Sequence, residues 1–465
     1  MNELLIEERE LPFASKKLAN GTHIVTSYFG SWVLLTPAEY NAFVAKQWTP
    51  ALRQKLEQNC IVLTKNNAKK LVQRYVGLNR HLFLQPSLHI INLTNMCNYR
   101  CWYCHAGVSQ GKEKMSLETA AKVVKWIIEN SGNTCTIEFQ GGEPLLNWPV
   151  LQFITEQARL LNKANKDLQI VIVSNTSLLD DEKLKWIIDN DVRLCTSLDG
   201  PPDVHNANRQ RIGGGATYDT TVANIQRVNK TYQEHHKPYQ VGALATITKN
   251  SLQSPKEIVD TYAALGMPVI YLRGLHNLGD AIKNWQTLEY SADEFVIFWK
   301  QALEHIISLN KKGVRIMEQG TLNILKKILA FQDPLYIEFM SPTGCGRGTL
   351  LYNFDGGIYS SDEGRMIADD IFKIGTVDEP PEDVLGNDNL VNTWAATFMD
   401  LYAYHSPFRP WLGTHPVLNY QTFGNMIPRI TETFWFKVHE QQCTFVFEKL
   451  SDPSWAEIFK NWVLQ

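Results

Sequence analysis

Two kinds of hydrophobic pattern, one typical of strands and one typical of helices, alternate along the middle of the chain. From about residue 87 to residue 272, short apolar runs typical of buried strands alternate with segments whose apolar residues recur every three or four positions. The helix that follows Ser116 is the clearest case, because Ser116 is a suitable N-cap and the apolar residues share one face. Six such strand–helix pairs predict an α/β fold with a parallel sheet, curved into a barrel or part of one.

The boundaries of these elements follow from the same pattern. The predicted strands are 88–93, 136–139, 168–173, 192–198, 241–247 and 269–272. The predicted helices are 117–128, 150–161, 182–190, 221–232, 255–265 and a longer one from a capping box at Ser291 to about residue 310.

A separate unit is predicted for residues 1–85. Two strand-like runs, 23–28 and 32–35, flank Gly30-Ser31, and Thr-Pro pairs at positions 36 and 49 begin helices. The pattern predicts a small winged-helix-like module. Its role is open between peptide binding and a packing cap on the main domain.

The remaining chain divides into residues 86–315, the partial (β/α)6 barrel, and residues 316–465, which are less regular. The second region contains a hairpin signal at Asp355-Gly356-Gly357. Three domains suit a chain of 465 residues.

Composition limits which partners and which cellular compartment are expected for the protein. Lys and Arg total 45 against 48 Asp and Glu, a net charge of −3, so bulk charge does not indicate nucleic acid or an anionic membrane as partner. The N-terminus lacks a signal-peptide pattern, and no apolar run approaches the roughly 18 residues that span a bilayer. We expect a cytoplasmic protein. Three of the eight cysteines crowd into eight residues, unlike a secreted disulfide framework.

The clustered cysteines are Cys97, Cys101 and Cys104. Four interpretations compete: a zinc site with His105, a c-type haem attachment sequence, unligated buried cysteines, and a [4Fe–4S] cluster held by three thiolates. Adjacency of His105 to Cys104 disfavours zinc, and haem attachment usually needs an exported chain. The iron–sulfur cluster is favoured, and three ligands leave one of its irons open.

Three further motifs stand where predicted strands end. They are residues 141–144 (GGEP), 174–177 (SNTS) and 197–200 (SLDG). In a parallel β/α barrel these positions share one rim with the cysteine segment, and active sites are formed on that rim. Each motif alone is only a turn signal, but all four on one rim predict a site.

The triplet in this setting strongly resembles the radical S-adenosylmethionine (SAM) superfamily. The resemblance implies that SAM binds the open iron through its amino and carboxylate groups. Electron transfer then cleaves SAM to methionine and a 5′-deoxyadenosyl radical, which takes a hydrogen atom from the substrate.

The resemblance also assigns roles around the cluster. It implies that Gly141, Gly142 and Glu143 serve the SAM amino group: the glycines allow close backbone approach and Glu143 supplies a carboxylate. Asn175 and Ser197 are expected to hydrogen-bond the ribose. Arg209 is expected to pair with the SAM carboxylate, with a surface arginine as the alternative.

Further segments narrow the resemblance. Residues 138–147 and 197–202 resemble the peptide-modifying branch, and residues 359–366 and 416–420 resemble the B-type maturase of the His-Xaa-Ser system. The implied partners are a ribosomally made precursor peptide, a second radical SAM maturase, and an electron donor such as flavodoxin or ferredoxin. Two alternatives stay open: a side-chain oxidase of the sulfatase-maturase kind and a non-catalytic peptide-binding scaffold.

The C-terminal region departs from cysteine-rich relatives. It has the outline of a SPASM-like auxiliary-cluster domain, but Ser361 stands where a cysteine is common and only Cys345 and Cys443 remain. We therefore expect a degenerate domain and one cluster per chain. His405 and His415 are expected to be surface or core residues, and Cys135 and Cys195 to be core residues.

A compact charged motif follows the C-terminal hairpin. It contains Asp362, Glu363 and Arg365. A role facing the substrate and a solvated salt-bridge cluster are both open.

Overall fold

The computed structural model describes residues 8–107, 112–340, 342–399, 405–413 and 415–465. A sheet of ten strands forms the centre of the molecule, in the order β14-β13-β12-β10-β9-β8-β6-β15-β16-β17. Its first eight strands run parallel to their neighbours, as in the pairing of β6 with β8 and of β8 with β9. The six consecutive β/α units predicted from the sequence are thereby confirmed.

The parallel strands lie close to the predicted positions. They are β6 (Leu88–Asn92), β8 (Thr134–Gln140), β9 (Asp167–Val173), β10 (Arg193–Ser197), β12 (Gly242–Thr246), β13 (Val269–Arg273) and the short β14 (Met317–Glu318). The covering helices are α4 (Leu117–Asn130), α5 (Trp148–Leu161), α6 (Asp181–Asp189), α8 (Tyr218–Glu234), α9 (Pro255–Ala264) and α11 (Ala292–Lys311).

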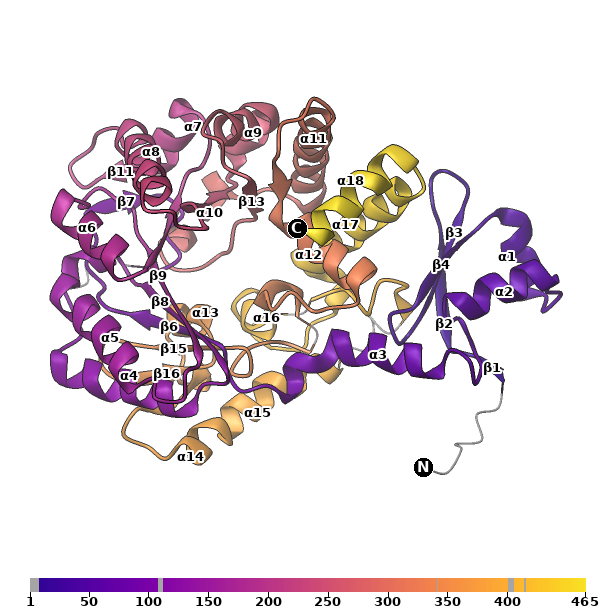
Figure 1. Cartoon of the computed structure of the whole chain (residues 1–465), viewed down its shortest axis with the longest axis horizontal. Helices are drawn as coiled ribbons and strands as arrows, with labels where there is room; N and C mark the ends of the chain where they lie inside the picture. Colours follow the sequence, from indigo (N-terminus) through magenta and orange to yellow (C-terminus); the bar gives the residue numbers. More distant parts are fainter. Residues whose placement is uncertain (1–7, 108–111, 341, 400–404, 414) are drawn as a thin grey trace.

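Each helix begins where its cap allows and buries one apolar face. Ser116 accepts the backbone N–H of Thr119 at the start of α4, and Val123 and Ile127 of that helix are fully buried. They pack with sheet residues such as Ile137 in one continuous hydrophobic core. Figure 1 shows α4, α5, α6 and α8 ranged along the outside of the sheet.

The C-terminal region joins the same sheet instead of standing apart. Strand β15 (Thr349–Tyr352) runs parallel beside β6 and forms the predicted hairpin with β16 (Gly357–Tyr359), which pairs with β17 (Lys373–Thr376). The helices of the region are α12 (Gln319–Leu325), α13 (Asp362–Ile367), α14 (Pro381–Leu385), α15 (Asp388–Ala395), α16 (Pro416–Phe423), α17 (Phe434–Leu450) and α18 (Pro453–Leu464). The first strand of the barrel therefore has a C-terminal strand as its neighbour.

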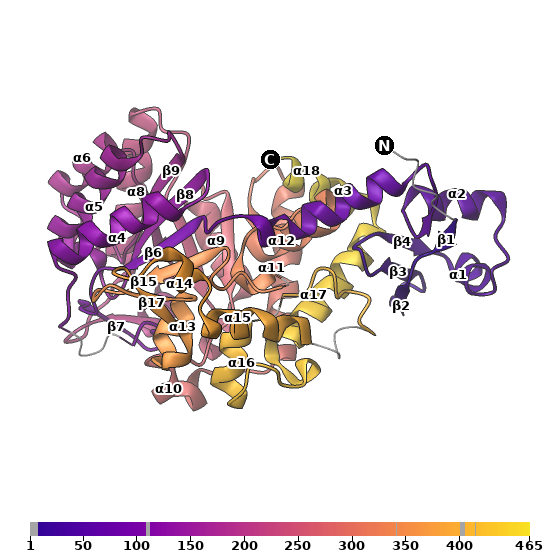
Figure 2. The ribbon, with the colours of Figure 1, turned by 90° about the horizontal axis from the view of Figure 1, so that it is seen from below.

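The N-terminal module has its own sheet and core. Its elements are β1 (Arg9–Glu10), β2 (Phe13–Lys17), β3 (His23–Ser27), β4 (Trp32–Leu35), α1 (Pro37–Val44), α2 (Pro50–Gln58), β5 (Val62–Leu63) and α3 (Ala68–Asn79). Figure 2 shows the module projecting from one end, with α3 leading to the barrel. Trp32 anchors it, since the indole N–H donates to the Ile328 carbonyl at 2.9 Å and the ring packs on Phe447.

Among the described residues, none of the helices combines the length and apolarity that a bilayer crossing requires.

Candidate functional site

The three clustered cysteines lie in the segment that follows β6. Strand β7 (Tyr99–Cys101) in this segment pairs antiparallel with β11 (Arg209–Arg211), so that Arg209 lies opposite Cys101. Each of the three cysteines is partly buried. The sequence pattern did not predict this pairing, because both strands are only three residues long and carry no β-branched run.

The three cysteine thiols lie near enough to influence one another's charge, and thiols are the ligands of iron–sulfur clusters. Burial raises the pKa of Cys97 to about 11 and that of Cys101 to about 12, and the neighbouring thiols contribute to both shifts. The backbone N–H of Tyr99 donates to Cys97 Sγ at 3.4 Å, a contact that also stabilises a thiolate ligand.

A single metal ion would need several side chains to converge on one point. Among the described residues no three His, Cys, Asp or Glu side chains could hold one metal ion together. A [4Fe–4S] cluster does not need that convergence, because each thiolate binds a different iron. Three thiols of one short segment are the donor set that such a cluster takes.

Gly141 and Gly142 pack against the cysteine segment itself. A Cβ at Gly142 would lie 2.1 Å from the Met96 carbonyl oxygen, and one at Gly141 would lie 2.4 Å from the Thr94 carbonyl oxygen. Gly141 also has a φ of 131°, which favours glycine. The Gly142 N–H donates to the Thr94 carbonyl at 2.7 Å. The observed close approach is thus to the backbone just before Cys97.

The Glu143 carboxylate links the GGEP motif (residues 141–144) to the SNTS motif (residues 174–177). It is fully buried, which raises its pKa. Its oxygens accept the backbone N–H of Leu145 at 3.0 Å, the Ser174 hydroxyl at 2.7 Å and the Asn175 N–H at 2.8 Å. A carboxylate offers about four acceptor positions, so about one is left for an ammonium group.

The two residues predicted for the ribose also lie at this end of the sheet. The Asn175 side chain donates to Asn98 Oδ1 at 2.8 Å and accepts the Ser177 hydroxyl at 2.7 Å. Ser197 is the last residue of β10 and is half-buried. Their contact with a ribose remains a prediction.

A buried polar network holds Arg209. Arg209 Nη1 donates to the Tyr103 hydroxyl at 2.7 Å, and this hydroxyl donates to the Asp199 carboxylate at 2.8 Å. Asn208 also donates to Asp199, at 3.3 Å. Arg209 is only 9% exposed, so the surface-arginine alternative is wrong. Asp199 carried only a turn signal in the sequence, yet its carboxylate is buried.

The charged motif after the C-terminal hairpin lies against the cysteine segment. Ser361 begins α13 as N-cap, accepting the Gly364 N–H at 3.1 Å. Arg365 Nη2 donates to the carbonyl of Ala106 at 3.4 Å, two residues beyond Cys104. Glu363 is 1% exposed, so the alternative of a solvated salt-bridge cluster is wrong for this residue.

Glu363 is at the centre of an ion-pair group. Arg273 Nη2 lies 3.5 Å from one carboxylate oxygen of Glu363 and 3.2 Å from Glu338, and His415 Nε2 lies 3.6 Å from the other oxygen. Burial opposes ionisation of Glu363, but His415 and Arg273 hold its pKa well below the usual range. Burial and the neighbouring Glu363 raise the pKa of Asp362 well above its usual range.

Sequence reasoning missed several members of this group. Arg273 is the last residue of β13, so the strand-end rule that found the other motifs would have found it too. His415 is buried, within the earlier expectation of a surface or core residue. His276, from the loop after β13, stacks on His105 with ring centroids 5.2 Å apart and the planes 6° apart. No sequence signal indicated this stacking.

Several buried atoms of the group have no hydrogen-bond partner among the described residues. They include both ring nitrogens of His276 and Nδ1 of His415. Such atoms are costly to leave unpaired. Together they mark a polar patch beside the cysteine segment.

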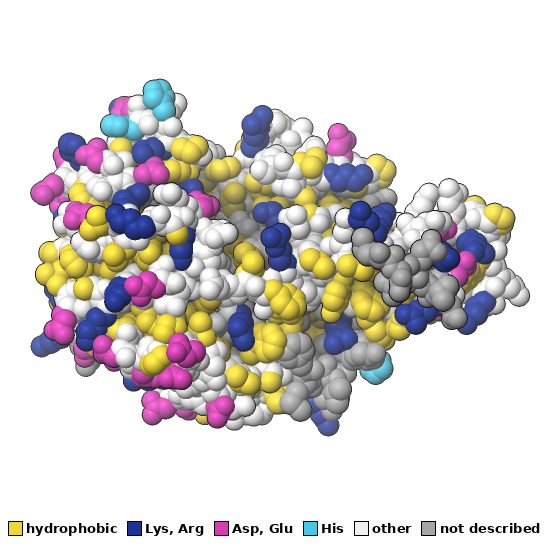
Figure 3. All heavy atoms as spheres, turned by 60° about the horizontal axis from the view of Figure 1, so that its bottom comes forward, with side chains coloured by type: hydrophobic (Ala, Val, Ile, Leu, Met, Phe, Trp, Pro, Cys, Tyr) yellow, Lys and Arg dark blue, Asp and Glu magenta, His cyan; other side chains and the backbone are white. Residues whose placement is uncertain are grey.

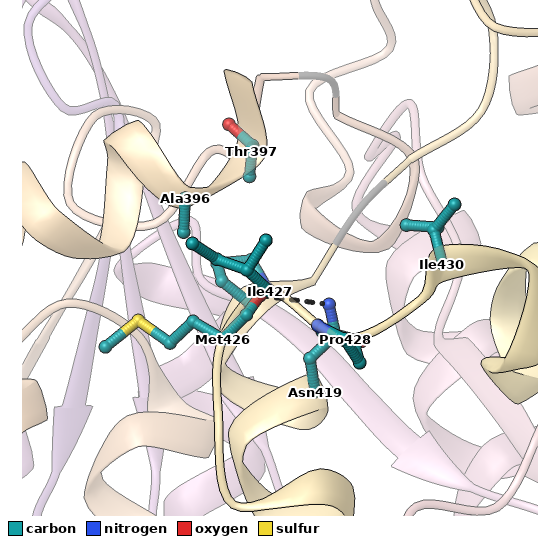
Figure 4. A pocket seen from close by; sticks show the side chains of 8 residues that line it. Ala396, Thr397, Asn419, Met426, Ile427, Pro428 and Ile430 are labelled. Atoms are coloured by element: carbon teal, nitrogen blue, oxygen red, sulfur yellow. Dashed lines mark hydrogen bonds between the residues drawn. The ribbon is translucent and has the colours of Figure 1, made fainter. Parts of the chain in front are cut away.

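Two cavities differ sharply in size. One of about 450 Å³ lies beside Cys101 and Trp102. The other, of about 10 Å³, lies between η7 (Ala396–Met399) and the segment after α16, where Asn419 donates to the Met426 carbonyl (Figure 4). The second has room for at most one water molecule.

Comparisons with known proteins identify one superfamily. Residues 91–239 match the family model described as the radical SAM superfamily. A cysteine-type anaerobic sulfatase-maturating enzyme of Clostridium perfringens is 27% identical over 181 residues, 37% of this chain and 47% of that enzyme. The radical SAM cyclopropyl synthase TigE of Paramaledivibacter caminithermalis is 25% identical over 150 residues, 29% of this chain and 31% of TigE. The matched segments thus span half or less of these two relatives.

Solved structures show the same fold over more of the chain. The structure of anSMEcpe with bound AdoMet has a TM-score of 0.68 at 17% identity, covering 81% of this chain and all of that one. Streptococcus suis SuiB bound to the precursor peptide SuiA has a TM-score of 0.54 at 10% identity, covering 90% of this chain and 98% of SuiB.

Proposed function

We propose that this chain, in which residues 91–239 form a radical SAM domain, is an enzyme that modifies a ribosomally made peptide. The observation that carries the proposal is the meeting of the cysteine triplet, the GGEP motif and Arg209 at one end of the parallel sheet. A scaffold without activity has no need to preserve this arrangement.

The superfamily uses a [4Fe–4S] cluster and SAM, and the residues fit both. Cys97, Cys101 and Cys104 would hold the cluster, and Arg209 would pair with the SAM carboxylate. When bound, these cofactors supply a 5′-deoxyadenosyl radical that abstracts a hydrogen atom from the substrate. The chain contributes the fixed position of Arg209, held by Tyr103 and Asp199, and the packing of Gly142 on the segment before Cys97.

The polar patch is where we place the reacting part of the peptide. Asp362, Glu363 and Arg365 come from α13, and Arg273 and His276 from the barrel, so both domains contribute to it. Arg365 connects this group to the cysteine segment through the Ala106 carbonyl. Both ring nitrogens of His276 and Nδ1 of His415 would pair with polar groups of the substrate.

The N-terminal module is proposed to hold the rest of the peptide. Its helix α3 exposes Val72, Tyr75 and Val76, at 59%, 46% and 52%, on neighbouring turns. Apolar side chains gather where the barrel meets this module (Figure 3). Among the described residues strand β2 has one strand neighbour, β3, so its other side is where an extended peptide would add as a further strand.

A sulfatase-maturase activity is the second candidate. It is favoured by the identity to the Clostridium perfringens enzyme and by the fold shared with anSMEcpe. The His-Xaa-Ser resemblance favours instead a peptide encoded beside this gene, a second radical SAM maturase as partner, and a cytoplasmic setting. The two candidates differ in their substrate.

Anaerobic reconstitution tests the proposal. With iron, sulfide, SAM and dithionite, the protein should form 5′-deoxyadenosine, and the Cys97→Ala variant should form none above background. Mass spectrometry of co-expressed peptides from neighbouring genes, beside a sulfatase-derived cysteine peptide, then separates the two candidates. Equal 5′-deoxyadenosine from both proteins would overturn the enzymatic assignment and favour a peptide-binding scaffold.

A further inference from the structure

The inner face of the parallel sheet carries an acid that has no role in the site described above. Glu138 of β8 is in register with Val171 of β9. Cys195 of β10 is in register with Val173, which shares a face with Val171 because the two are two residues apart. By the same alternation this face also includes Arg193, Ser197, Leu244, Tyr271 and Arg273. Residues of the other face, such as Ile137, are buried against the helices, so Glu138 points to the interior of the partial barrel.

The Glu138 carboxylate keeps spare acceptor positions. It is half-buried, and its hydrogen bond among the described residues comes from the Gln140 side chain, at 2.5 Å. A carboxylate offers about four acceptor positions, so about three are left for a ligand. Burial raises the pKa of Glu138, because the ionised form loses contact with water. A positive group from outside the chain would stabilise the ionised form.

The two arginines of this face have other partners. Arg273, the last residue of β13, pairs with Glu338 at 3.2 Å and with Glu363 at 3.5 Å. Arg193, the first residue of β10, is exposed and lies over a tyrosine ring, 5.1 Å from the centroid of Tyr239. Neither guanidinium forms an ion pair with Glu138, so a cation that enters the barrel meets a negative charge that has no partner.

Two tyrosine rings meet on the same side of the sheet. Tyr271 and Tyr336 pack edge to face, with centroids 6.1 Å apart and planes 87° apart. Tyr336 belongs to the C-terminal region, directly before η5 (Ile337–Phe339), and is 36% exposed. Burial and nearby negative charges, that of Glu138 among them, raise the pKa of Tyr336 to about 12. Aromatic rings near a carboxylate are a combination that attracts cations.

We propose that Glu138, Tyr271 and Tyr336 form a subsite for a cationic side chain of the peptide, that of lysine or arginine. The Glu138 carboxylate would pair with the ammonium or guanidinium group, and the tyrosine rings would cover the alkyl stem and attract the charge. Strand β8 leads directly into the GGEP motif, so the bound side chain lies in the barrel that carries the predicted cofactor residues. The inference rests on the proposed function, because it names a side chain that the peptide presents to the barrel.

Binding of three short peptides to the reconstituted full chain tests the proposal. Each peptide is capped at both ends and has two glycines on either side of a central lysine, norleucine or glutamate, so that charge is the main difference. The test variant is Glu138→Gln, whose amide oxygen can still accept the Gln140 hydrogen bond. The matched control is Glu156→Gln, which removes the same charge from an exposed position on α5. Dissociation constants are measured by ligand-observed NMR titration without reductant.

The parent and the Glu156→Gln control should bind the lysine peptide roughly 10-fold more tightly than the norleucine peptide, and the glutamate peptide most weakly. Glu138→Gln should bind the lysine and norleucine peptides alike. Tyr336→Leu should weaken lysine-peptide binding by about threefold, whereas Tyr336→Phe should not, because a phenyl ring also attracts a cation. A lysine preference that survives in Glu138→Gln would overturn the proposal.

The unmodified protein decides the question if Glu138→Gln fails to fold, which circular dichroism would show. Equal dissociation constants of the parent for the three peptides would then overturn the subsite, and the predicted ranking together with the Tyr336 pair of variants would support it. A separate assay of SAM cleavage with dithionite tests the proposed function. Absence of 5′-deoxyadenosine would refute that function, while the peptide ranking, which needs no turnover, still decides the subsite.

Discussion

Arg209 lies opposite Cys101 in the two-stranded ladder of β7 and β11, and its guanidinium is held by the Tyr103 hydroxyl at 2.7 Å. A predicted cofactor-binding residue and a predicted cluster ligand therefore share one rigid unit. Any shift of β11 changes the position of the guanidinium relative to the cluster.

The first prediction concerns this pair. Arg209→Lys should weaken SAM binding by roughly 10- to 100-fold, because a lysine cannot pair bidentately with a carboxylate. Tyr103→Phe should weaken it by about fivefold, since Arg209 then loses one holding contact. The measurement is equilibrium SAM binding to the reconstituted proteins, with iron content as the control. Unchanged SAM binding by Arg209→Lys at full iron content would refute the assigned role.

The second prediction concerns the packing of the GGEP motif. Gly142→Ala should lower the iron bound per chain, because the new methyl group would lie 2.1 Å from the Met96 carbonyl oxygen and displace the segment before Cys97. Gly132→Ala is the matched control, since its nearest neighbour would be 3.7 Å away. Iron analysis and circular dichroism should show iron loss in Gly142→Ala alone, with secondary structure kept in both.

The third prediction concerns the number of clusters. Cys345 and Cys443 are buried in separate hydrophobic clusters, and the Thr343 hydroxyl donates to Cys345 Sγ at 3.2 Å. We expect about four irons per chain after reconstitution, as one [4Fe–4S] cluster requires. Cys345→Ala should leave that value unchanged. About eight irons with the EPR signal of a second cluster would contradict a degenerate C-terminal domain.

The fourth prediction concerns Glu363. Glu363→Gln keeps the shape of the side chain but removes the charge that pairs with Arg273 and His415. Peptide modification should fall by at least about tenfold, whereas SAM cleavage without peptide should stay within about twofold. Parallel quantification of modified peptide and 5′-deoxyadenosine checks this. An equal loss of both products would instead indicate damage to the SAM site.

The fifth prediction concerns acid stability. Burial and the nearby Lys327 lower the pKa of His439 to about 3, and its ring stacks on Phe339 with centroids 4.6 Å apart. Unfolding lets this histidine take up a proton between pH 6.5 and pH 3, so its contribution to stability falls as the pH drops through that window. At pH 5 the loss is on the order of 2 kcal/mol.

His439→Phe should therefore flatten the decline of the free energy of unfolding between pH 6.5 and pH 5, measured by denaturant titration. The exposed His235 serves as the control, and His235→Gln should reproduce the parent profile. An unchanged slope in His439→Phe would show that His439 is not the source of acid sensitivity.

The sequence by itself determined the positions of most strands, helices and motifs in the barrel. Strand and helix periods located the six β/α units, and Ser116 and Ser291 marked helix starts that the structure confirms with cap hydrogen bonds. The cysteine spacing and the motifs after the strands were enough to predict that these segments meet at one end of the sheet, as the contacts of Cys101 with Arg209 and of Gly142 with Thr94 show. Periodicity and capping act over a few residues, so a single sequence displays them.

Tertiary structure alone decided how distant segments meet. The pairing of Cys101 with Arg209, the neighbouring positions of β6 and β15, and the contact of His276 with His105 all join residues that are far apart in the chain. Burial decided between a solvated and an interior position for Glu363, and only the full packing of the barrel against the C-terminal region produces that burial. Contacts of this kind depend on how whole helices and strands pack together. The sequence around each residue does not determine that packing.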